Sequence, residues 1–243
     1  MYWQQWSDRL KRETSLGTEP LAVSYAGAPA PGTNPAQGKV SVCQAIKRAC
    51  EGEVITITAQ TCGCPGGLAS LGLGELSPQG RERIVDFLVN HEKVYCSRIA
   101  IHRGQQSVPR PMGVASHVHF TPLSKAEILP DLIVFIGKPG ALHPLVSFAG
   151  YWEGGPIKAE LSGPACRTGI AYPIVTGEIG LSILDSGARK LARFPDDHLL
   201  LAIPFHRMIG IMHALDQGIG AARDEDTESM ERRIDQFGKV EPV

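Results

Sequence analysis

The sequence predicts one compact domain of the α/β or α+β class, with a mixed sheet that helices cover on both faces. Residues 132–136 (LIVFI) form an apolar run that is typical of a strand buried on both sides. Segments with strand patterns alternate with helical segments along most of the 243 residues, as expected where helices cover a sheet. Hydrophobic residues make up 43 % and charged residues 20 % of the chain, which is the balance of a globular protein that folds without disulfides.

The elements of the first half follow from periodicity and capping signals. Three regions are expected: an N-terminal helix in residues 1–18, a single domain in residues 19–220 and a charged tail in residues 221–243. Ser41 is a good N-cap for a helix over residues 42–50, which Gly52 is placed to end. Residues 53–59 are rich in β-branched side chains and predict a strand in the centre of the sheet. The other elements expected here are a strand at 21–25, a loop at 27–38, a short helix after Gly67 and helices at 77–90 and 91–102.

The second half continues the alternation. The expected strands are 115–121, 132–136, 158–161, 179–184 and 199–203, and the expected helices are 140–152, 166–170, 186–189 and 205–216. The helix at 205–216 is more apolar than one buried face requires, which predicts a central position or a homodimer interface. The charged tail is expected to be a loosely docked helix or partly disordered.

Two stretches share one order of elements and suggest two pseudo-repeated halves. Each runs from a strand to a cysteine at a helix start, then to a second strand and a glycine-containing turn before a short helix. The first begins at Leu21 and ends in the short helix after Cys64-Pro-Gly-Gly, and the second begins at Lys158 and ends in the short helix after Ser186-Gly-Ala-Arg189. A repeat would place Cys43 and Cys166 at equivalent ends of two half-sites.

Composition and motifs exclude several classes of function. The net charge of −1 argues against a protein that binds nucleic acid through its phosphate backbone. No apolar run reaches the roughly 18 residues of a membrane-spanning helix. The N-terminal segment lacks a signal-peptide core, so we expect a cytoplasmic protein with no membrane partner. Nucleotide-binding loops are missing as well, so no nucleotide cofactor is expected.

The segment Cys62-Gly-Cys64-Pro-Gly-Gly67 is the sharpest local motif. Six cysteines in a reducing compartment are buried thiols, metal ligands or catalytic groups rather than a disulfide framework. The motif lies between a predicted strand and a predicted helix, where free N–H groups favour a thiolate. Gly66 and Gly67 would let the backbone approach a ligand closely. The structural alternative is a tight glycine turn with incidental cysteines.

Cys43 and Cys166 also stand near predicted helix starts. Taken alone, each is more often a small buried hydrophobe, but three cysteines in this environment favour a shared role. Cys50 and Cys96 fall within predicted helices and are interpreted as core or partly exposed thiols.

Histidines and one arginine complete the set of candidate residues. His117 and His119 alternate on a predicted strand and share a face, as a polar strand surface or as zinc or iron ligands. His206 and His213 are expected on a helix surface or in a pocket. Arg189, after Gly187, would contact an anionic ligand or pair with the aspartates at positions 196 and 197.

A set of short motifs resembles one known family. The motifs are Val42-Cys43-Gln-Ala, Cys64-Pro-Gly-Gly with Leu71-Gly-Leu73, Pro130-Asp131 before LIVF, Ala165-Cys166, Gly187-Ala-Arg189 and Asp196-Asp197 before LLLAIP. They resemble the uncharacterised ArCR family over residues 20–215, and the family name brings no established activity. The resemblance implies that Cys43, Cys64 and Cys166 are the family-type cysteines. Cys50, Cys62 and Cys96 are additions, and His198 stands where the family often has an acidic residue.

These observations lead to an iron–sulfur hypothesis. Cys43, Cys64 and Cys166 would ligate a [4Fe–4S] cluster with one open iron. The protein would be an oxidoreductase or lyase acting on a small anionic molecule. Cys62 and Arg189 are the candidate catalytic residues, and Gly66, Gly67 and Gly187 the candidate cofactor contacts. If Cys62 completed the cluster, electron transfer to a redox partner protein would be favoured.

Three alternatives stay open. One is a metal-free thiol enzyme with Cys64 as nucleophile and Cys62 or Cys43 as resolving thiol. Another is a non-catalytic module that binds a small anion, with the cysteines in its core. The weakest is a zinc site, for which His117 and His119 would have to join the cysteines.

Overall fold

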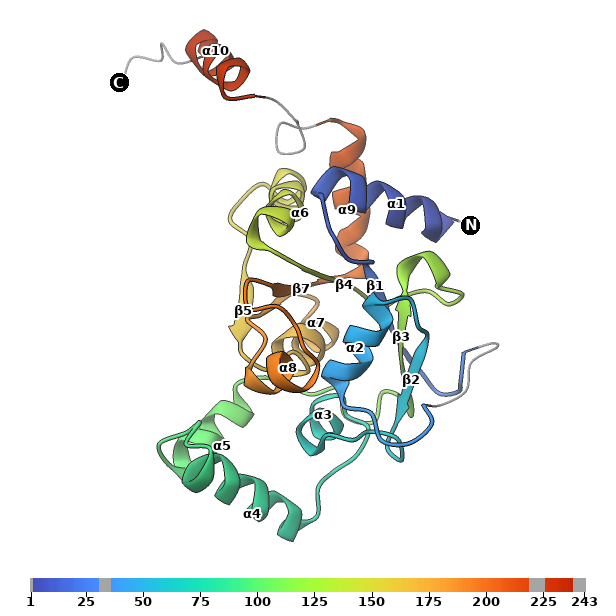
Figure 1. The fold of residues 1–243 in the computed structure, drawn as a ribbon, viewed down its shortest axis with the longest axis vertical. Helices are drawn as coiled ribbons and strands as arrows, with labels where there is room; N and C mark the ends of the chain where they lie inside the picture. The colour runs from blue at the N-terminus through green and yellow to red at the C-terminus, as the bar shows by residue number, and fades with distance from the viewer. Residues whose placement is uncertain (1, 31–35, 219–225, 238–243) are drawn as a thin grey trace.

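A seven-stranded mixed sheet with helices on both faces forms the body of the protein (Figure 1). The computed structural model describes residues 2–30, 36–218 and 226–237. The strands are β1 (Leu21–Ala26), β2 (Ile55–Thr58), β3 (His117–Pro122), β4 (Leu132–Gly137), β5 (Ala159–Ser162), β6 (Ile179–Ser182) and β7 (Leu199–Pro204). Their order across the sheet is β2-β3-β1-β4-β7-β6-β5, and every pair is antiparallel except β5 with β6. The predicted fold class and mixed sheet are confirmed.

One face of the sheet is covered by long helices that bury an apolar core. These helices are α1 (Tyr2–Thr14), α6 (Pro139–Glu153) and α9 (Phe205–Asp216), which lie above the sheet in Figure 1. Phe135, Phe148 and Met208 are fully buried between helices and sheet. The apolar helix predicted at 205–216 is therefore α9, and its apolarity reflects its place in this core.

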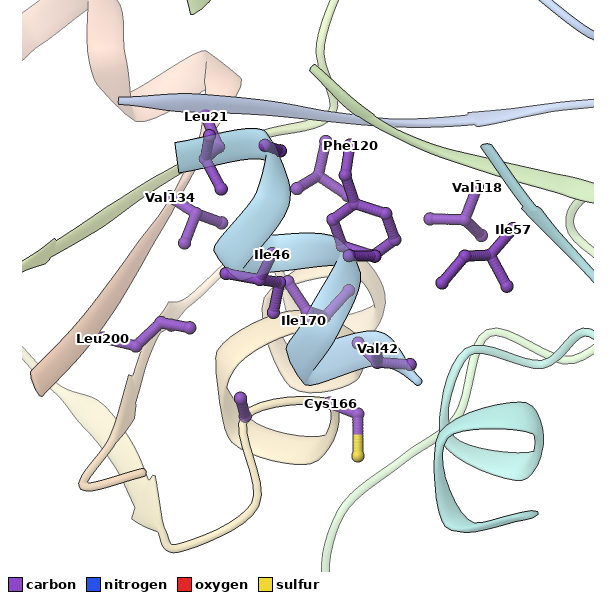
Figure 2. Close-up of a cluster of buried hydrophobic side chains, with 14 of the residues drawn as sticks. Leu21, Val42, Ile46, Ile57, Val118, Phe120, Val134, Cys166, Ile170 and Leu200 are labelled. Atoms are coloured by element: carbon purple, nitrogen blue, oxygen red, sulfur yellow. The ribbon is translucent and has the colours of Figure 1, made fainter. Parts of the chain in front are cut away.

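The opposite face carries shorter elements. They are α2 (Val42–Cys50), α3 (Pro65–Ser70), the π-helical turn η3 (Arg167–Ala171), α7 (Tyr172–Thr176) and α8 (Ser186–Leu191). Helix α2 begins and ends where the sequence predicts, because Ser41 and Gln44 form a reciprocal capping box at its start. Its buried Ile46 side chain packs in the same core as Phe120 of β3 and Val134 of β4 (Figure 2). The short helix predicted from Cys166 is a π-helical turn rather than an α-helix.

The strand predicted to be central lies at the edge of the sheet. Among the described residues, β2 pairs with β3 alone. Its four residues are nevertheless all buried, as in a central strand. The carbonyl of Thr56 accepts a hydrogen bond from the Ala36 N–H at 3.0 Å, so the loop before α2 covers part of this edge. Burial by a loop thus gives an edge strand the composition of a central one.

A second correction concerns the segment between the two halves. Helices α4 (Pro78–Asp86) and α5 (Arg98–Gln106), with the turn η1 (Phe87–His91), form a lobe beside the body in Figure 1. The helix predicted at 91–102 begins only at Arg98, because Ser97 caps it by accepting the Ala100 N–H at 3.2 Å. The Arg167 side chain reaches this lobe and donates to the Gly104 carbonyl.

The two stretches with a shared order of elements pair differently in the sheet. Strands β5 and β6 are adjacent and parallel, whereas β3 lies between β1 and β2. The charged tail contains helix α10 (Thr227–Phe237), on which Met230 and Ile234 are exposed. The expectations for residues 31–35, 219–225 and 238–243 lie outside the described residues.

Candidate functional site

The three cysteines singled out by the sequence lie on the same face of the sheet. Cys43 is in the first turn of α2, Cys64 is the N-cap of α3, and Cys166 directly precedes η3. Figure 2 shows Cys166 below Val42, at the start of α2. The three thiols are close enough for a charge on one to oppose ionisation of another. Three loops distant in sequence therefore meet at one cysteine cluster, defined here as Cys43, Cys64 and Cys166.

Burial and mutual repulsion keep two of these thiols protonated. Burial is the largest cause that raises the pKa of Cys43, followed by the charges of Cys166, Asp185 and Cys64. Burial and then the charge of Cys64 raise the pKa of Cys166 to about 12, and a hydrogen bond from Ser70 offsets only part of this. Cys43 and Cys166 are therefore not activated thiolates in the free protein, and both would gain from a bound cationic group.

The Cys62–Gly67 motif forms a strand-to-helix turn, as predicted. The Cys64 Sγ accepts the Gly67 N–H at 3.3 Å, which makes the sulfur part of the helix cap. The Cys62 thiol donates to the Cys64 carbonyl oxygen at 3.4 Å and is buried in the core. Burial is the main cause that raises the pKa of Cys62. Cys62 thus supports the backbone that carries Cys64.

The candidate cofactor-binding glycines have different surroundings. A Cβ on Gly67 would lie 2.6 Å from the Val42 Cγ2, so this glycine permits the close approach of α3 to α2. A Cβ on Gly66 would meet only the Cys64 Sγ, at 3.9 Å. A Cβ on Gly187 would lie 3.3 Å from the Asp185 Oδ1, within the cap of α8. Contact of these glycines with a cofactor stays a prediction.

Three residues that the motif analysis did not select adjoin the cysteine cluster. Ser70, at the end of α3, bonds to the Cys166 thiol, and Asp185 caps α8 beside Cys43 and Cys166. Tyr25 lies at the end of β1 on this face, and its hydroxyl is buried without a hydrogen-bond partner in the part of the chain described. Burial, and then the charges of Asp131 and Cys166, raise the pKa of this phenol. In the sequence, Tyr25 stands out little as a site residue, because it is simply the third inward-facing position of an alternating strand.

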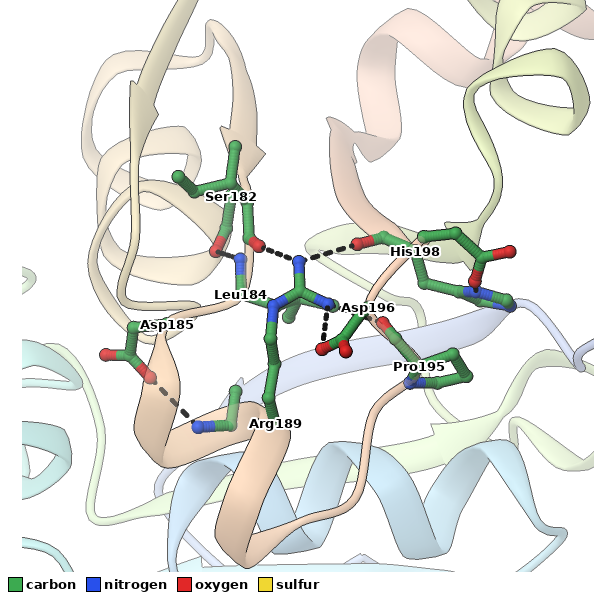
Figure 3. A network of polar contacts seen from close by, with 10 residues as sticks. Ser182, Leu184, Asp185, Arg189, Pro195, Asp196 and His198 are labelled. Carbon is green, nitrogen blue, oxygen red and sulfur yellow. Dashed lines mark hydrogen bonds and ion pairs between the residues drawn. The ribbon is translucent and has the colours of Figure 1, made fainter.

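Arg189 lies in a network of backbone carbonyls (Figure 3). Its guanidinium donates to the carbonyls of Pro195 at 2.5 Å, Ile183 at 2.6 Å and His198 at 3.4 Å. It also lies 3.7 Å from the carboxylate of Asp196. These contacts tie the segment after β6 to the segment before β7. Recognition of an anionic substrate by Arg189 stays a prediction.

The two histidines of β3 lie on the other face of the sheet from the cysteine cluster. Their neighbours Val118 and Phe120 point into the core that contains Cys166, so the alternation of the strand directs His117 and His119 the opposite way. The His119 ring contacts the Thr56 Oγ1 at 2.8 Å and the Ala28 carbonyl oxygen at 3.3 Å. The structure therefore does not bring the histidines to the cysteines, as the zinc alternative requires.

The other thiols do not join the cysteine cluster. All six cysteines are free; Cys50 packs on the core at the end of α2, and Cys96 is exposed on the α4–α5 lobe. Within residues 2–30, 36–218 and 226–237, no three side chains of the His, Cys, Asp and Glu type are arranged to hold a single metal ion. The cysteine cluster is a gathering of thiols rather than a closed mononuclear site.

Two grooves lie away from the cysteine cluster. One, of about 520 Å³, runs between α1 and α9 and is lined by Trp6, Met212 and the Arg9–Asp216 ion pair. The other, of about 490 Å³, lies between α2 and the end of α8 and is lined by Lys39, Lys47, Arg48 and Arg193, among others. Lys39 donates to the Gln60 carbonyl oxygen, Lys47 pairs with Glu51, and Arg48 pairs with Glu53. These three cations therefore already have partners within the protein.

Comparison with known proteins agrees with the resemblance found in the sequence. One relative, Uncharacterized protein MJ0308 from Methanocaldococcus jannaschii, is 28 % identical over 99 residues, which are 40 % of this chain and 42 % of that protein. The match thus spans less than half of either protein. No solved structure shows significant similarity to the chain.

None of the described helices combines the length and apolarity needed to cross a membrane.

The family match covers most of the fold. The sequence model of the family described as Uncharacterised ArCR matches residues 9–214, from within α1 to within α9, and so includes the sheet and the whole cysteine cluster. The chain therefore belongs to the uncharacterised ArCR family.

Proposed function

We propose that this protein is an iron–sulfur protein in which Cys43, Cys64 and Cys166 hold a [4Fe–4S] cluster. The observation that carries the proposal is that these three cysteines, from the first turn of α2, the N-cap of α3 and the residue before η3, lie on one face of the sheet within reach of each other's charge. Thiolates are the general ligands of such clusters. If the thiols were buried only as small apolar side chains, there would be no reason for three of them to share one site, where their negative charges would repel each other.

The electrostatics of the cysteine cluster favour a bound cationic group over a metal-free nucleophile. A catalytic thiol needs a lowered pKa, whereas the pKa values of Cys43 and Cys166 are raised by burial and by neighbouring negative charges. Iron would reverse this balance, because metal binding deprotonates thiol ligands and compensates their charge.

The chemistry of the site follows from its ligand count. Three protein thiolates leave one iron open, and an open iron binds and polarises an oxygen or sulfur atom of a substrate. We therefore propose redox or elimination chemistry on a small anionic molecule. Should Cys62 supply a fourth thiolate, electron exchange with a redox partner protein would replace substrate binding. The charge of Cys64 contributes, after burial, to the raised pKa of Cys62, so the two thiols are near enough for Cys62 to be tested in this role.

The test is the metal content of protein purified without oxygen. We expect iron and sulfide in equal amounts and a broad charge-transfer absorption in the visible range. Serine substitution of Cys43, Cys64 or Cys166 should abolish the absorption, whereas Cys50→Ser and Cys96→Ser should retain it as matched controls. A colourless wild-type protein after anaerobic reconstitution with iron and sulfide would overturn the proposal.

One observation favours a second candidate, a thiol enzyme with Cys64 as nucleophile. Cys64 is more exposed than Cys166, and its sulfur accepts the backbone N–H of Gly67. Labelling the iron-free protein with an alkylating reagent separates the two functions. A single thiol far more reactive than a model thiol, lost in Cys64→Ser, would support the thiol enzyme. Uniformly slow labelling would support the cluster.

A further inference from the structure

The hydroxyl of Tyr25 is an unsatisfied polar group inside the protein. Its oxygen is buried, and within the described residues it has no hydrogen-bond partner. Buried tyrosine hydroxyls in native proteins normally have one. The backbone on either side is well anchored, since the Tyr25 N–H donates to Asp131 at 2.7 Å and the residue pairs with Val118 of β3. The hydroxyl thus has no partner among the described residues even though the strand that carries it is firmly held.

Comparison with another buried, unpaired atom sets Tyr25 apart. The Nη1 of Arg207 also lacks a partner, but the rest of that guanidinium pairs with Glu153 at 3.1 Å and Glu178 at 3.0 Å. Arg207 is thus a largely satisfied group with one idle nitrogen. The single polar atom of the Tyr25 side chain, in contrast, has no partner at all among the described residues, which is the state expected of a hydroxyl that bonds to a bound group.

The position of Tyr25 indicates where that partner would be. Tyr25 packs against the same core as Cys43 and Cys166, and it is close enough to Cys166 for the two to interact electrostatically. A free phenol ionises only near pH 10, so at neutral pH its oxygen carries a proton to donate. The electron-rich atoms expected at the cysteine cluster are thiolate and sulfide sulfurs.

We propose that the Tyr25 hydroxyl donates a hydrogen bond to a sulfur atom of the iron–sulfur group on its Cys166 side. This assignment rests on the proposed function and makes Tyr25 a positioning residue rather than a ligand. A hydrogen bond to a cluster sulfur stabilises the more negative, reduced state and raises the reduction potential. It also opposes loss of the cluster, because that loss leaves the hydroxyl unpaired again.

The test compares Tyr25→Phe with the wild type, with and without the cluster. In the iron-free protein, Tyr25→Phe should melt at the same temperature as the wild type or higher, because no hydrogen bond is lost. In the reconstituted protein, its reduction potential should be more negative. Loss of iron to a chelator should be about two- to tenfold faster, which is the loss expected for one hydrogen bond. Tyr151→Phe, at an exposed position of α6, is the matched control and should change neither property.

The outcomes separate this inference from the proposed function. A wild type that never binds iron overturns both. A Tyr25→Phe variant that binds iron with unchanged potential and unchanged rate of loss overturns only the role of Tyr25. A clearly lower melting temperature of the iron-free variant would also overturn it, since the hydroxyl would then have a partner in the protein itself.

Discussion

The two faces of the sheet are built on different principles. One face is covered by α1, α6 and α9, which have 13, 15 and 12 residues and bury an apolar core with Phe148 at its centre. The other is covered by α2, of nine residues, and by α3, η3, α7 and α8, of five or six residues each. The buried thiols, the unpaired Tyr25 hydroxyl and the Arg189 network all lie with these short elements.

This difference indicates that one face of the sheet provides folding stability and the other provides the binding site. A long helix can bury an apolar stripe along several turns, whereas a short element exposes its ends and brings loops and caps to the sheet. The short helices therefore place Cys43 and Cys64 at helix starts, next to the loop that carries Cys166. We expect the apolar face to determine how firmly the protein folds and the thiol-bearing face to determine what it binds.

The largest effect is expected from removing a buried ring on either face. Phe148→Ala on the apolar face and Phe120→Ala on the thiol-bearing face should each lower the free energy of unfolding by about 3–5 kcal/mol. Only Phe120→Ala should also lower the iron content per folded chain, because Phe120 packs in the same core as α2, the helix that carries Cys43. Urea unfolding and iron assay on the folded fraction measure the two quantities. Equal iron loss in both variants would contradict the separation of the faces.

Arg189 tests whether the polar network supports the thiol-bearing face. Arg189→Met removes three charged hydrogen bonds to carbonyls and should cost about 1.5–3 kcal/mol in urea unfolding. Lys190→Met, at an exposed neighbouring position, should cost almost nothing. A variant that unfolds like the wild type but loses affinity for small anions would instead support the predicted substrate contact.

Gly67 and Gly66 form a matched pair for the approach of α3 to α2. Gly67→Ala places a methyl group 2.6 Å from the Val42 Cγ2 and should cost about 1–3 kcal/mol through overpacking. The shift of α3 should move Cys64 away from Cys43 and lower the iron content. Gly66→Ala meets only the Cys64 Sγ, at 3.9 Å, and should leave the free energy of unfolding almost unchanged. A Gly67→Ala variant with normal iron content, or one as stable as Gly66→Ala, would contradict this interpretation.

A final effect is a pH dependence of stability, of about 1.4 kcal/mol per pH unit for each thiol, that the thiol-bearing face should confer on the iron-free protein. An unfolded cysteine ionises near pH 8.5, whereas burial and the charge of Cys64 raise the pKa of Cys166 to about 12 in the folded state. Between these values the folded state holds a proton that the unfolded state has lost, so stability falls as the pH rises. The slope is about 1.4 kcal/mol per pH unit for each such thiol.

Urea unfolding between pH 8.5 and about pH 10.5 measures this slope. Cys166→Ala should reduce the slope of the free energy of unfolding against pH by the contribution of one thiol. Phe148→Ala should lower the free energy of unfolding at every pH and leave this slope unchanged. A slope that Cys166→Ala does not alter would mean that Cys166 ionises alike in both states.

The elements were predictable because their signals are local. The capping box of Ser41 and Gln44 involves residues three apart, and the apolar run at 132–136 marks β4 without reference to the rest of the chain. The helix start near Cys43 follows from the same local pattern, whereas the helix predicted from Cys166 is a π-helical turn without a side-chain cap. The edge position of β2 was not predictable, because its burial comes partly from a hydrogen bond between Thr56 and Ala36, in a loop that precedes α2.

The sequence by itself determined the fold class, most helices and strands, and the three cysteines worth testing. The tertiary structure alone decided that Cys43, Cys64 and Cys166 meet and that His117 and His119 face away from them. It also decided that the Tyr25 hydroxyl has no partner among the described residues. Periodicity and capping depend on contacts within a few residues, so the sequence displays them directly. The cysteine cluster depends on strand order and on the packing of loops more than a hundred residues apart along the chain, which no local pattern encodes.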